Sequence, residues 1–479
     1  MPIQDLEQNE TINRLLRMLP SVNDVLVAPA YQSLLNTNSR KVLLIATRQA
    51  LAKLRFEISS GKHTASSLQK CIEQLPEAMA KNLVSNRQYS LRTAINATGV
   101  ILHTNLGRAP LSEAALRHVV EIGQDYCNLE LNLESGDRSR RDLHAESLVL
   151  RVLKGMDAED ADQNKYGVII VNNCAAATFL GLNSLAQKSE VIVSRGELVE
   201  IGGGFRIPEI MEKSGAILRE VGTTNRTRLA DYESALGPAT GLLLRVHQSN
   251  FSIEGFSERP ILKELVALSR RTGVPLFEDQ GTGLVTSLEQ FGIKGEHSLM
   301  RSFASGVDLI SASGDKLIGG PQCGILVGKQ ELIASIRKNP LLRAFRVDKL
   351  TYAALEATLL EYLSDTPASI PVQRMLGIPQ EEIMRRCNQI MYEIASPRLS
   401  LDVVPVASLI GGGTAPKASL PSYALSVQHV AQTPSELLAT LRGLDPPVVG
   451  RIADDAVLLD LRTVPAGFDT DLVTLLSGL

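Results

Sequence analysis

The sequence predicts an α/β protein whose mainly parallel sheet follows a helical amino-terminal domain and precedes an α+β domain. Residues 1–90 carry apolar side chains at helical spacing. From about Arg92, short β-branched runs alternate with helical segments, a pattern typical of a parallel sheet with crossover helices. From about residue 345 helices return, and short strands follow them. A chain of 479 residues is long enough for two or three such domains.

The amino-terminal region reads as helices. Residues 41–58 and 66–83 both place apolar side chains every three or four positions. Leu19-Pro20-Ser21 indicates a helix end followed by a new N-cap. We therefore expect a helical domain at residues 1–65 and a linker helix at residues 66–90.

Residues 40–92 are strongly basic, with ten Lys or Arg residues against the acids Glu57, Glu73 and Glu77. Such a segment is suited to nucleic-acid binding, although the same pattern also occurs on solvated helix faces. Aromatic residues are rare there, so base stacking by this segment is not indicated.

The central region contains the predicted sheet. Seven apolar runs read as strands, at residues 167–171, 190–194, 216–221, 241–246, 274–279, 308–313 and 323–328. Ligands of such sheets bind beyond the carboxyl ends of the strands. We expect a large domain at residues 91–345 and a small α+β domain at residues 346–479.

Composition narrows the class of protein. Hydrophobic residues make up 44% and charged residues 21% of the chain, and the net charge is −3. No run approaches the roughly 20 apolar residues that a membrane span needs, and the start lacks a signal-peptide pattern. We expect a cytoplasmic protein with no membrane segment. The five cysteines form no CxxC pair and the seven histidines no HExxH motif, so no metal site is indicated.

Two strand ends carry residues suited to a pyridoxal phosphate (PLP) site. Lys316 follows the apolar run 308–313, where desolvation lowers the pKa of an amine and suits it to Schiff-base formation. Asp279 ends the strand at 274–279 and is placed to pair with a protonated pyridine nitrogen. Taken alone, each is more commonly a solvated strand end or a turn former. Together, a strand-end Asp followed by a strand-end Lys resembles the fold-type I, aspartate-aminotransferase-like PLP enzymes.

Small residues open the helix after the first predicted strand, in the stretch Asn172-Asn173-Cys174-Ala175-Ala176. Free backbone N–H groups at such a helix start attract a phosphate group. We therefore assign cofactor binding to Cys174, Ala175 and Ala176, with Cys174 as a small spacer. Ser313 and His247 complete the predicted cofactor set. The residue that stacks on the ring is expected within residues 197–205 or at His247, for which a buried structural role is the alternative interpretation.

Longer stretches resemble bacterial selenocysteine synthases, the L-seryl-tRNA(Sec) selenium transferases. The matching stretches span nearly the whole chain: INATGVILHTNLGRAPLS (95–112), residues 193–227 and 246–256, SGDKLIGGPQCGILVG (313–328), PLLRAFRVDKLT (340–351) and GGGTAPKASLPSYAL (411–425). LPSVNDVL (19–26) is similar to the tRNA-binding domain of that family.

The resemblance implies conversion of seryl-tRNA(Sec) to selenocysteinyl-tRNA(Sec) with selenophosphate, through a dehydroalanyl intermediate, by a PLP enzyme that assembles as a homo-oligomer, a decamer in bacteria. It implies that Lys316 carries the cofactor and Asp279 faces its ring nitrogen. Arg108, Arg343 and Arg346 would hold the anionic selenium donor, since guanidinium groups grip phosphate-like oxyanions in a bidentate manner. Asp315 is a candidate for assisting proton transfer or meeting the aminoacyl end.

Some features depart from the family pattern. Cys174 stands where an Asn is common, and Gln-Gly-Thr-Gly follows Asp279 where Leu-Gly-Ser-Gly is common. Residues 158–166 read as a surface insertion. Two rival interpretations remain open: a PLP lyase of the same fold acting on a small amino acid or amino-sugar acid, and a non-catalytic RNA-binding scaffold. The amino-terminal domain and the LLRAFR arginines count against the lyase, and the retained Lys316 and Asp279 count against the scaffold.

Overall fold

The computed structural model describes residues 3–85, 89–155, 165–201, 204–251, 253, 255–364, 366–415 and 418–479. The chain divides into two compact units, Met1–Thr93 and Ala94–Leu479. Residues 158–164 of the predicted insertion lie outside the described residues. Among the described residues, no helix has both the length and the apolar character that a bilayer crossing requires.

The first unit is helical, as the spacing of its apolar residues predicted. Its helices are α1 (Ile3–Arg17), α2 (Val22–Val27), α3 (Gln32–Thr37), α4 (Arg40–Ser59), α5 (Ala65–Glu73) and α6 (Leu75–Ser85). Leu43 and Leu51 of α4 pack in one core with Leu68 of α5 and Met79 of α6. Residues 66–85, expected as a linker helix, therefore share the core of the helices before them.

The apolar pattern at residues 66–83 forms two helices rather than one. Gln74 caps the end of α5, and Pro76 is the second residue of α6. A proline ring clashes with the carbonyl group four residues earlier in a continuous helix, whereas proline is tolerated in the first turn of a new one. Pro76 thus accounts for the break.

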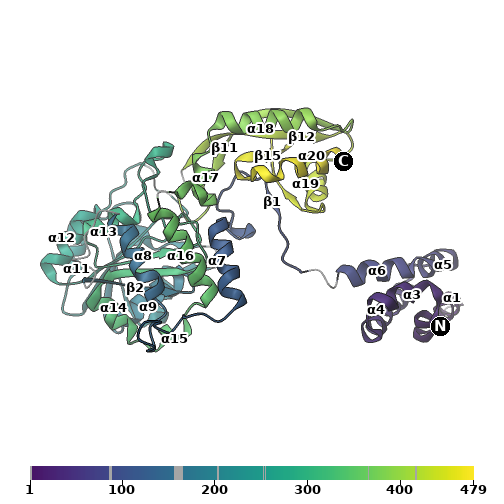
Figure 1. Cartoon of the computed structure of the whole chain (residues 1–479), viewed down its shortest axis with the longest axis horizontal. Coiled ribbons are helices and arrows are strands. Elements are labelled where there is room, and N and C mark those ends of the chain that lie inside the picture. The colour runs from purple at the N-terminus through teal and green to yellow at the C-terminus, as the bar shows by residue number, and fades with distance from the viewer. Residues whose placement is uncertain are drawn as a thin grey trace. The chain divides into compact units, whose positions relative to one another are not determined.

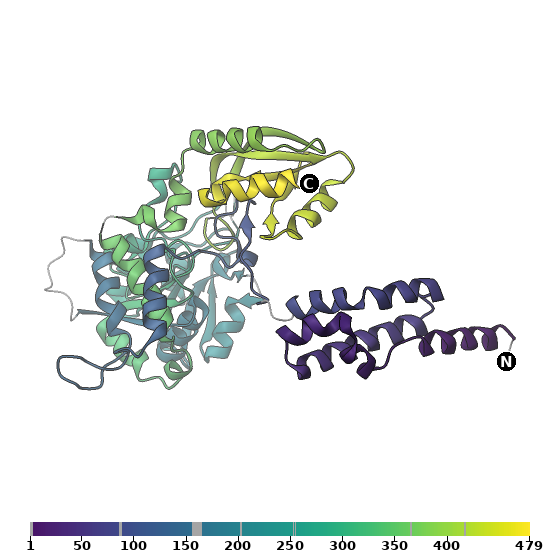
Figure 2. The ribbon, with the colours of Figure 1, turned by 45° about the vertical axis from the view of Figure 1, so that its right-hand side comes forward.

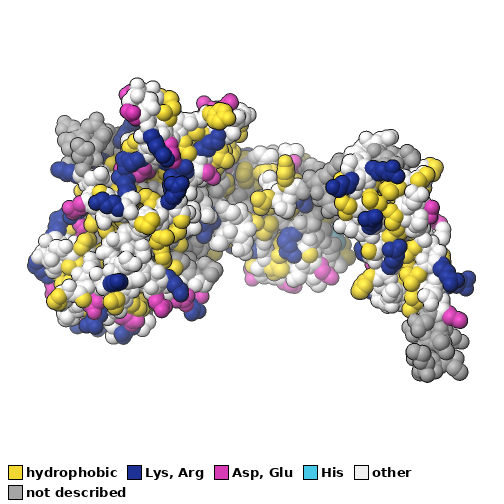
Figure 3. Space-filling view, turned by 90° about the horizontal axis from the view of Figure 1, so that it is seen from below, with side chains coloured by type: hydrophobic (Ala, Val, Ile, Leu, Met, Phe, Trp, Pro, Cys, Tyr) yellow, Lys and Arg dark blue, Asp and Glu magenta, His cyan; other side chains and the backbone are white. Residues whose placement is uncertain are grey.

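The surface of the first unit is rich in Lys and Arg side chains, drawn in dark blue at the right of Figure 3. Nine of the ten basic residues counted in the sequence are exposed, and Arg87 lies outside the described residues: Arg40, Lys41, Arg48, Lys53, Arg55, Lys62, Lys70, Lys81 and Arg92. Phe56, on the same helix α4, is 71% exposed.

The second unit is built around a seven-stranded sheet (Figure 1). Its strands are β2 (Tyr166–Val171), β3 (Glu190–Ser194), β6 (Ile217–Val221), β7 (Thr240–Val246), β8 (Leu276–Asp279), β9 (Leu309–Ser313) and β10 (Gly324–Lys329), in the order β2-β10-β9-β8-β7-β3-β6. Only β10 runs antiparallel to its neighbours among these seven. All seven predicted runs are strands of this sheet, and the prediction of a mainly parallel sheet is confirmed.

Helices cover both faces of this sheet. One face packs against residues of α8 (Leu143–Lys154), α12 (Leu262–Thr272), α13 (Leu299–Ser305) and α16 (Lys349–Leu363). The other face packs against α9 (Cys174–Leu185), α10 (Ile207–Ser214) and α14 (Gln330–Arg337). Successive strand residues point to opposite faces, so Leu276 joins the first core and Phe277 the second.

A second, four-stranded sheet follows in the order β11 (Leu399–Leu409), β12 (Ser419–His429), β15 (Ala456–Asp460) and β14 (Arg451–Ala453). Helix α18 (Gln380–Glu393) runs along β11 and β12 (Figure 2). Strand β1 (Ile95–Asn96) pairs in parallel with β13 (Val448–Val449), so Ile95 lies in the core of this carboxyl-terminal sheet. Helix α16, expected in the small domain, instead packs on the large sheet.

Candidate functional site

A cavity of about 220 Å³ lies where β7, β8 and β9 end and α9 begins. It collects eight of the residues that the sequence predicted for the site: Arg108, Cys174, Ala175, His247, Asp279, Ser313, Asp315 and Lys316. We call it the Lys316 cavity. The side chains converge because the carboxyl ends of neighbouring parallel strands meet at one edge of the sheet.

Lys316 is 8% exposed, and its Nζ donates a hydrogen bond of 2.7 Å to the carbonyl oxygen of Gly413. Burial lowers the pKa of Lys316, and the nearby charge of Arg108 acts in the same direction. Gly413 has a φ of +81°, and a Cβ at this position would lie 3.1 Å from Nζ. The glycine loop at residues 411–413 therefore covers the lysine, a contact that the sequence did not reveal.

Asp279 is buried at the end of β8, with two hydrogen-bond donors on one oxygen. Ser311 Oγ donates to its Oδ1 at 2.9 Å, and Cys174 Sγ lies 3.5 Å from the same atom. Burial raises the pKa of Asp279, whereas these two donors and the charge of Lys316 lower it. Thr178 Oγ1 lies 3.2 Å from Ser311 Oγ and extends the network.

The sequence offered one signal for this support: Ser311 is a polar residue inside the apolar run 308–313. A buried strand position occupied by a hydroxyl needs a hydrogen-bond partner. The partner, Asp279, is 32 residues away along the chain, so the pairing became visible only with the register of β8 and β9.

The start of α9 presents backbone donors to the Lys316 cavity. Asn173 is the N-cap, and its side chain accepts from Ala176 N at 2.8 Å. The N–H of Ala176 is thereby occupied, and those of Cys174 and Ala175 remain as the first-turn donors for an anion. Burial strongly raises the pKa of Cys174, so its thiol stays protonated.

Arg108 and Asp315 form an ion pair of 2.6 Å at the wall of the cavity. Arg108 has a φ of +63°, a conformation that non-glycine residues rarely adopt and that clusters at functional sites. Asp315 is 7% exposed, and its carboxylate fixes the direction of the guanidinium group. The geometry places the Asp315 carboxylate against Arg108; its predicted role in proton transfer or at the aminoacyl end stays a prediction.

The other two predicted arginines do not line this cavity. Arg343 is exposed on the short helix α15 (Leu341–Ala344). Arg346 pairs with Glu130 at 3.4 Å and lines a separate cavity of about 300 Å³ together with Arg138 and Arg141. Within one chain, the structure thus brings Arg108 to Lys316 but not Arg343 or Arg346.

The residues of the Lys316 cavity fit pyridoxal phosphate. A buried amine with a lowered pKa, a buried carboxylate and free helix N–H groups stand around one space. Ser311 and Cys174 both donate to Asp279 Oδ1, and the carboxyl group of Asp279 would pair with the ring nitrogen. Among the residues that the structure describes, no cluster of three or more His, Cys, Asp or Glu could hold a metal ion.

Two family models match the chain: L-seryl-tRNA selenium transferase over residues 94–465 and selenocysteine synthase N terminal over residues 16–55. The L-seryl-tRNA(Sec) selenium transferase of Aquifex aeolicus is 42% identical over 466 residues, 96% of this chain and 97% of the relative. That of Moorella thermoacetica is 43% identical over 463 residues, 95% and 94% of the two chains.

Among solved structures, D-glucosaminate-6-phosphate ammonia-lyase resembles the chain with a TM-score of 0.57 at 19% identity, over 81% of this chain and 95% of that chain. This likeness concerns the fold, and it confirms the predicted fold-type I architecture.

Proposed function

The chain belongs to the L-seryl-tRNA selenium transferase family, and from this premise we propose how its residues convert L-seryl-tRNA(Sec) to L-selenocysteinyl-tRNA(Sec). The protein is a PLP-dependent transferase with a seryl-tRNA substrate. One observation supports the assignment of the reacting site above others. Lys316 and Asp279, at the ends of neighbouring strands, share a buried cavity with the start of α9.

Bound through Lys316, pyridoxal phosphate supplies an electron sink that acidifies the seryl Cα–H and lets the β-hydroxyl group leave. Lys316 is the base that takes the Cα proton and later returns it. Its lowered pKa favours the neutral amine that this step requires. Asp279, which accepts a hydrogen bond from Ser311, would pair with the ring nitrogen and favour its protonated form.

Arg108 is the residue of this cavity that we assign to the selenium donor, which we propose to be selenophosphate. One Nη of its guanidinium group meets Asp315, and the remaining N–H groups are available to a phosphate oxygen. The ion pair holds the planar group in one orientation, so the donor meets the β-carbon in a fixed position.

Arg343 and Arg346 complete the donor site in our proposal, but from a second copy of the chain. They lie outside the Lys316 cavity of their own chain, so they serve the donor only if a partner presents them. We therefore propose a homo-oligomer with shared active sites, a decamer as the family resemblance implies.

The helical unit Met1–Thr93 is proposed to hold the tRNA. Its exposed Lys and Arg side chains and the match of residues 16–55 to the amino-terminal model support this role. Because the net charge of the chain is −3, binding must rest on local positive charge and RNA shape rather than on the charge of the whole protein. We place the reaction in the cytoplasm, where aminoacyl-tRNAs serve translation.

The decisive experiment measures selenium transfer from selenophosphate to seryl-tRNA(Sec) by the purified PLP-loaded protein. Lys316→Ala should abolish both the transfer and the visible absorbance of the lysine-bound cofactor. Lys338→Ala, at an exposed lysine, should leave both unchanged. If free amino acids rather than seryl-tRNA perturb the cofactor spectrum of the wild-type protein, the lyase interpretation holds instead.

A further inference from the structure

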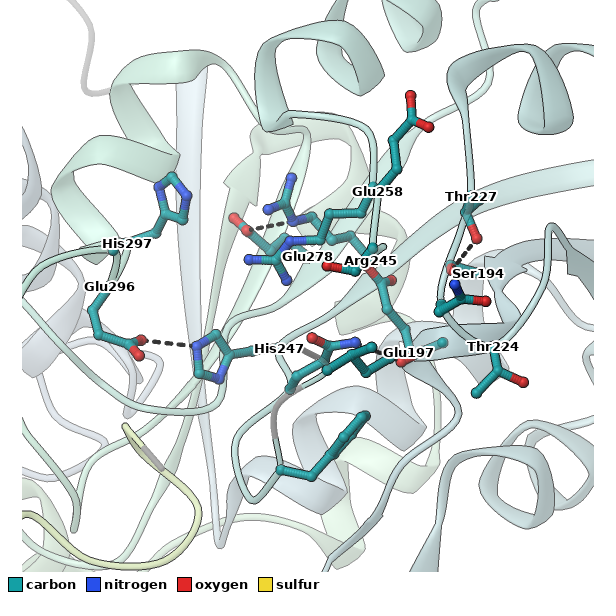
Figure 4. A pocket seen from close by; sticks show the side chains of 18 of the residues that line it. Ser194, Glu197, Thr224, Thr227, Arg245, His247, Glu258, Glu278, Glu296 and His297 are labelled. Atoms are coloured by element: carbon teal, nitrogen blue, oxygen red, sulfur yellow. Dashed lines mark hydrogen bonds and ion pairs between the residues drawn. The ribbon is translucent and has the colours of Figure 1, made fainter. Parts of the chain in front are cut away.

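A second cavity, of about 340 Å³, is drawn in Figure 4 and shares lining residues with the Lys316 cavity. His247 and Gln280 line both spaces. In the middle of the second cavity Arg245 on β7 faces Glu278 on β8, at paired positions of the two strands. We call this space the Arg245 cavity. Nothing in the proposed transfer chemistry uses it.

Arg245 and Glu278 are only 5% and 4% exposed, yet their hydrogen bonding is incomplete. Arg245 Nε lies 3.5 Å from Glu278 Oε1, but Arg245 Nη1 and Glu278 Oε2 have no hydrogen-bond partner in the described part of the chain. Unpaired buried polar atoms are costly, and an ion pair left in this state destabilises the fold. A ligand with an acceptor and a donor side by side would satisfy both atoms at once.

The charges around the Arg245 cavity argue against an anionic ligand. Three cations and four carboxylates line it: Arg245, Arg259, Lys294, Glu197, Glu258, Glu278 and Glu296. Burial lowers the pKa of His297 to about 4, so this lining ring is neutral at physiological pH. Without an excess of positive charge, a phosphate group gains little here, whereas an uncharged polar ligand is accommodated.

The substrate itself supplies such a ligand. The seryl group that reacts at Lys316 is esterified to the terminal ribose of the tRNA, and the base on that ribose is adenine. Adenine places the N7 acceptor beside the N6 amino donor, which is complementary to Arg245 Nη1 and Glu278 Oε2. We propose that the Arg245 cavity binds the 3′-terminal adenosine of the aminoacyl-tRNA, an inference that rests on the proposed function.

Phe251 provides a surface for the base. It lines the Arg245 cavity and keeps 36% of its area exposed. Proteins recognise unpaired nucleotides by stacking them on aromatic rings and by hydrogen bonds to their edges. The shared residues His247 and Gln280 then lie between the base and the ester, which places the seryl group in the Lys316 cavity.

The test is a binding cycle on the full-length holoenzyme with uncharged tRNA(Sec), measured by fluorescence anisotropy. We compare RNA ending in the terminal adenosine with RNA lacking that nucleoside, for wild type, Phe251→Ala and Phe251→Tyr. Stacking on an aromatic ring gives about a 5- to 150-fold effect. Wild type and Phe251→Tyr should therefore prefer the complete RNA, and in Phe251→Ala this preference should shrink by the stacking factor, leaving only the part that the Arg245–Glu278 pair supplies.

A second comparison tests the Arg245–Glu278 pair by changing the hydrogen-bonding groups of the terminal base. Terminal inosine replaces the 6-amino donor by an oxygen acceptor, so wild type should bind it about 10-fold more weakly or worse than adenosine. Glu278→Gln should erase that preference, because an amide can also donate. Retained cofactor absorbance and thermal melting show that each variant is folded.

Three results would overturn the proposal: equal binding of the two RNAs by wild type, an adenosine effect that is undiminished in Phe251→Ala, or displacement of the RNA end by inorganic phosphate in a Phe251-dependent manner. Each can occur while wild type still makes selenocysteinyl-tRNA(Sec), in which case this inference alone fails. If wild type makes none, the proposed function itself is wrong.

Discussion

Ser311→Ala tests whether the ionisation of Asp279 depends on a single buried donor. Ser311 has 0% exposure, and its hydroxyl group lies 2.9 Å from Asp279 Oδ1. A hydrogen bond to a charged group contributes about 1.5–3 kcal/mol. If all of this stabilisation reaches the transition state, kcat should fall about 10- to 150-fold.

The pH dependence of kcat tests the direction in which the pKa of Asp279 changes. Burial already raises the pKa of Asp279, and Ser311 counteracts that rise. Removing the donor raises the pKa further, so less carboxylate remains at a given pH and the acid limb of the kcat–pH profile should move to higher pH. Thr178→Val removes a hydroxyl group that lies 3.2 Å from Ser311 Oγ and lowers the pKa of Asp279 less than Ser311 does, so it should shift the profile less in the same direction.

The assay is the rate of selenium transfer across a pH series, alongside the absorbance of the bound cofactor. Ser302→Ala is the matched control, because it removes another fully buried hydroxyl group, one with no hydrogen-bond partner in the described chain. It should leave the profile unchanged. A Ser311→Ala enzyme with wild-type kcat and an unmoved acid limb would show that Asp279 does not depend on this donor.

Two further predictions concern assembly and tRNA. Lys316→Ala and Arg343→Ala should each be inactive alone. After the two variants are mixed by reversible unfolding, activity should recover to on the order of a quarter of wild type, because half of the randomly paired dimers contain both variants and each of these has one intact shared site of two. If no activity returns, Arg343 acts in the site of its own chain. Deleting residues 1–93 should weaken tRNA binding in a filter or anisotropy assay while cofactor absorbance is retained. The reason is that the hydrophobic cores on the two sides of this boundary share no residue. Loss of the cofactor would contradict the independence of the two units. Cutting at residue 60 would instead divide the core that Leu51 shares with Leu68.

The large sheet could be predicted from sequence because each buried strand is a local signal. A run such as residues 167–171 is apolar on both faces, and helices cover both faces of the sheet that it enters. Lys316 and Asp279 were found for the same reason, since they are polar residues at the ends of such runs. Their side chains line one cavity because β8 and β9 are neighbours.

Contacts between distant segments could not be predicted in this way. Gly413 accepts the hydrogen bond of Lys316 from 97 residues away, and β1 pairs with β13 across more than 350 residues. No local pattern encodes either pairing. Arg343 and Arg346 illustrate a different limit: the motif that suggested them says nothing about which cavity, or which copy of the chain, receives them.

The alternation of side chains along two strands explains why two cavities meet at one edge of the sheet. Asp279 and Glu278 are successive residues of β8, so they point to opposite faces, as Phe277 and Leu276 do before them. Asp279 reaches the cofactor side, and Glu278 meets Arg245 on the other. The sequence pattern indicated only Asp279. Glu278, adjacent in sequence yet on the opposite face, is the acid that our further inference assigns to the base of the substrate.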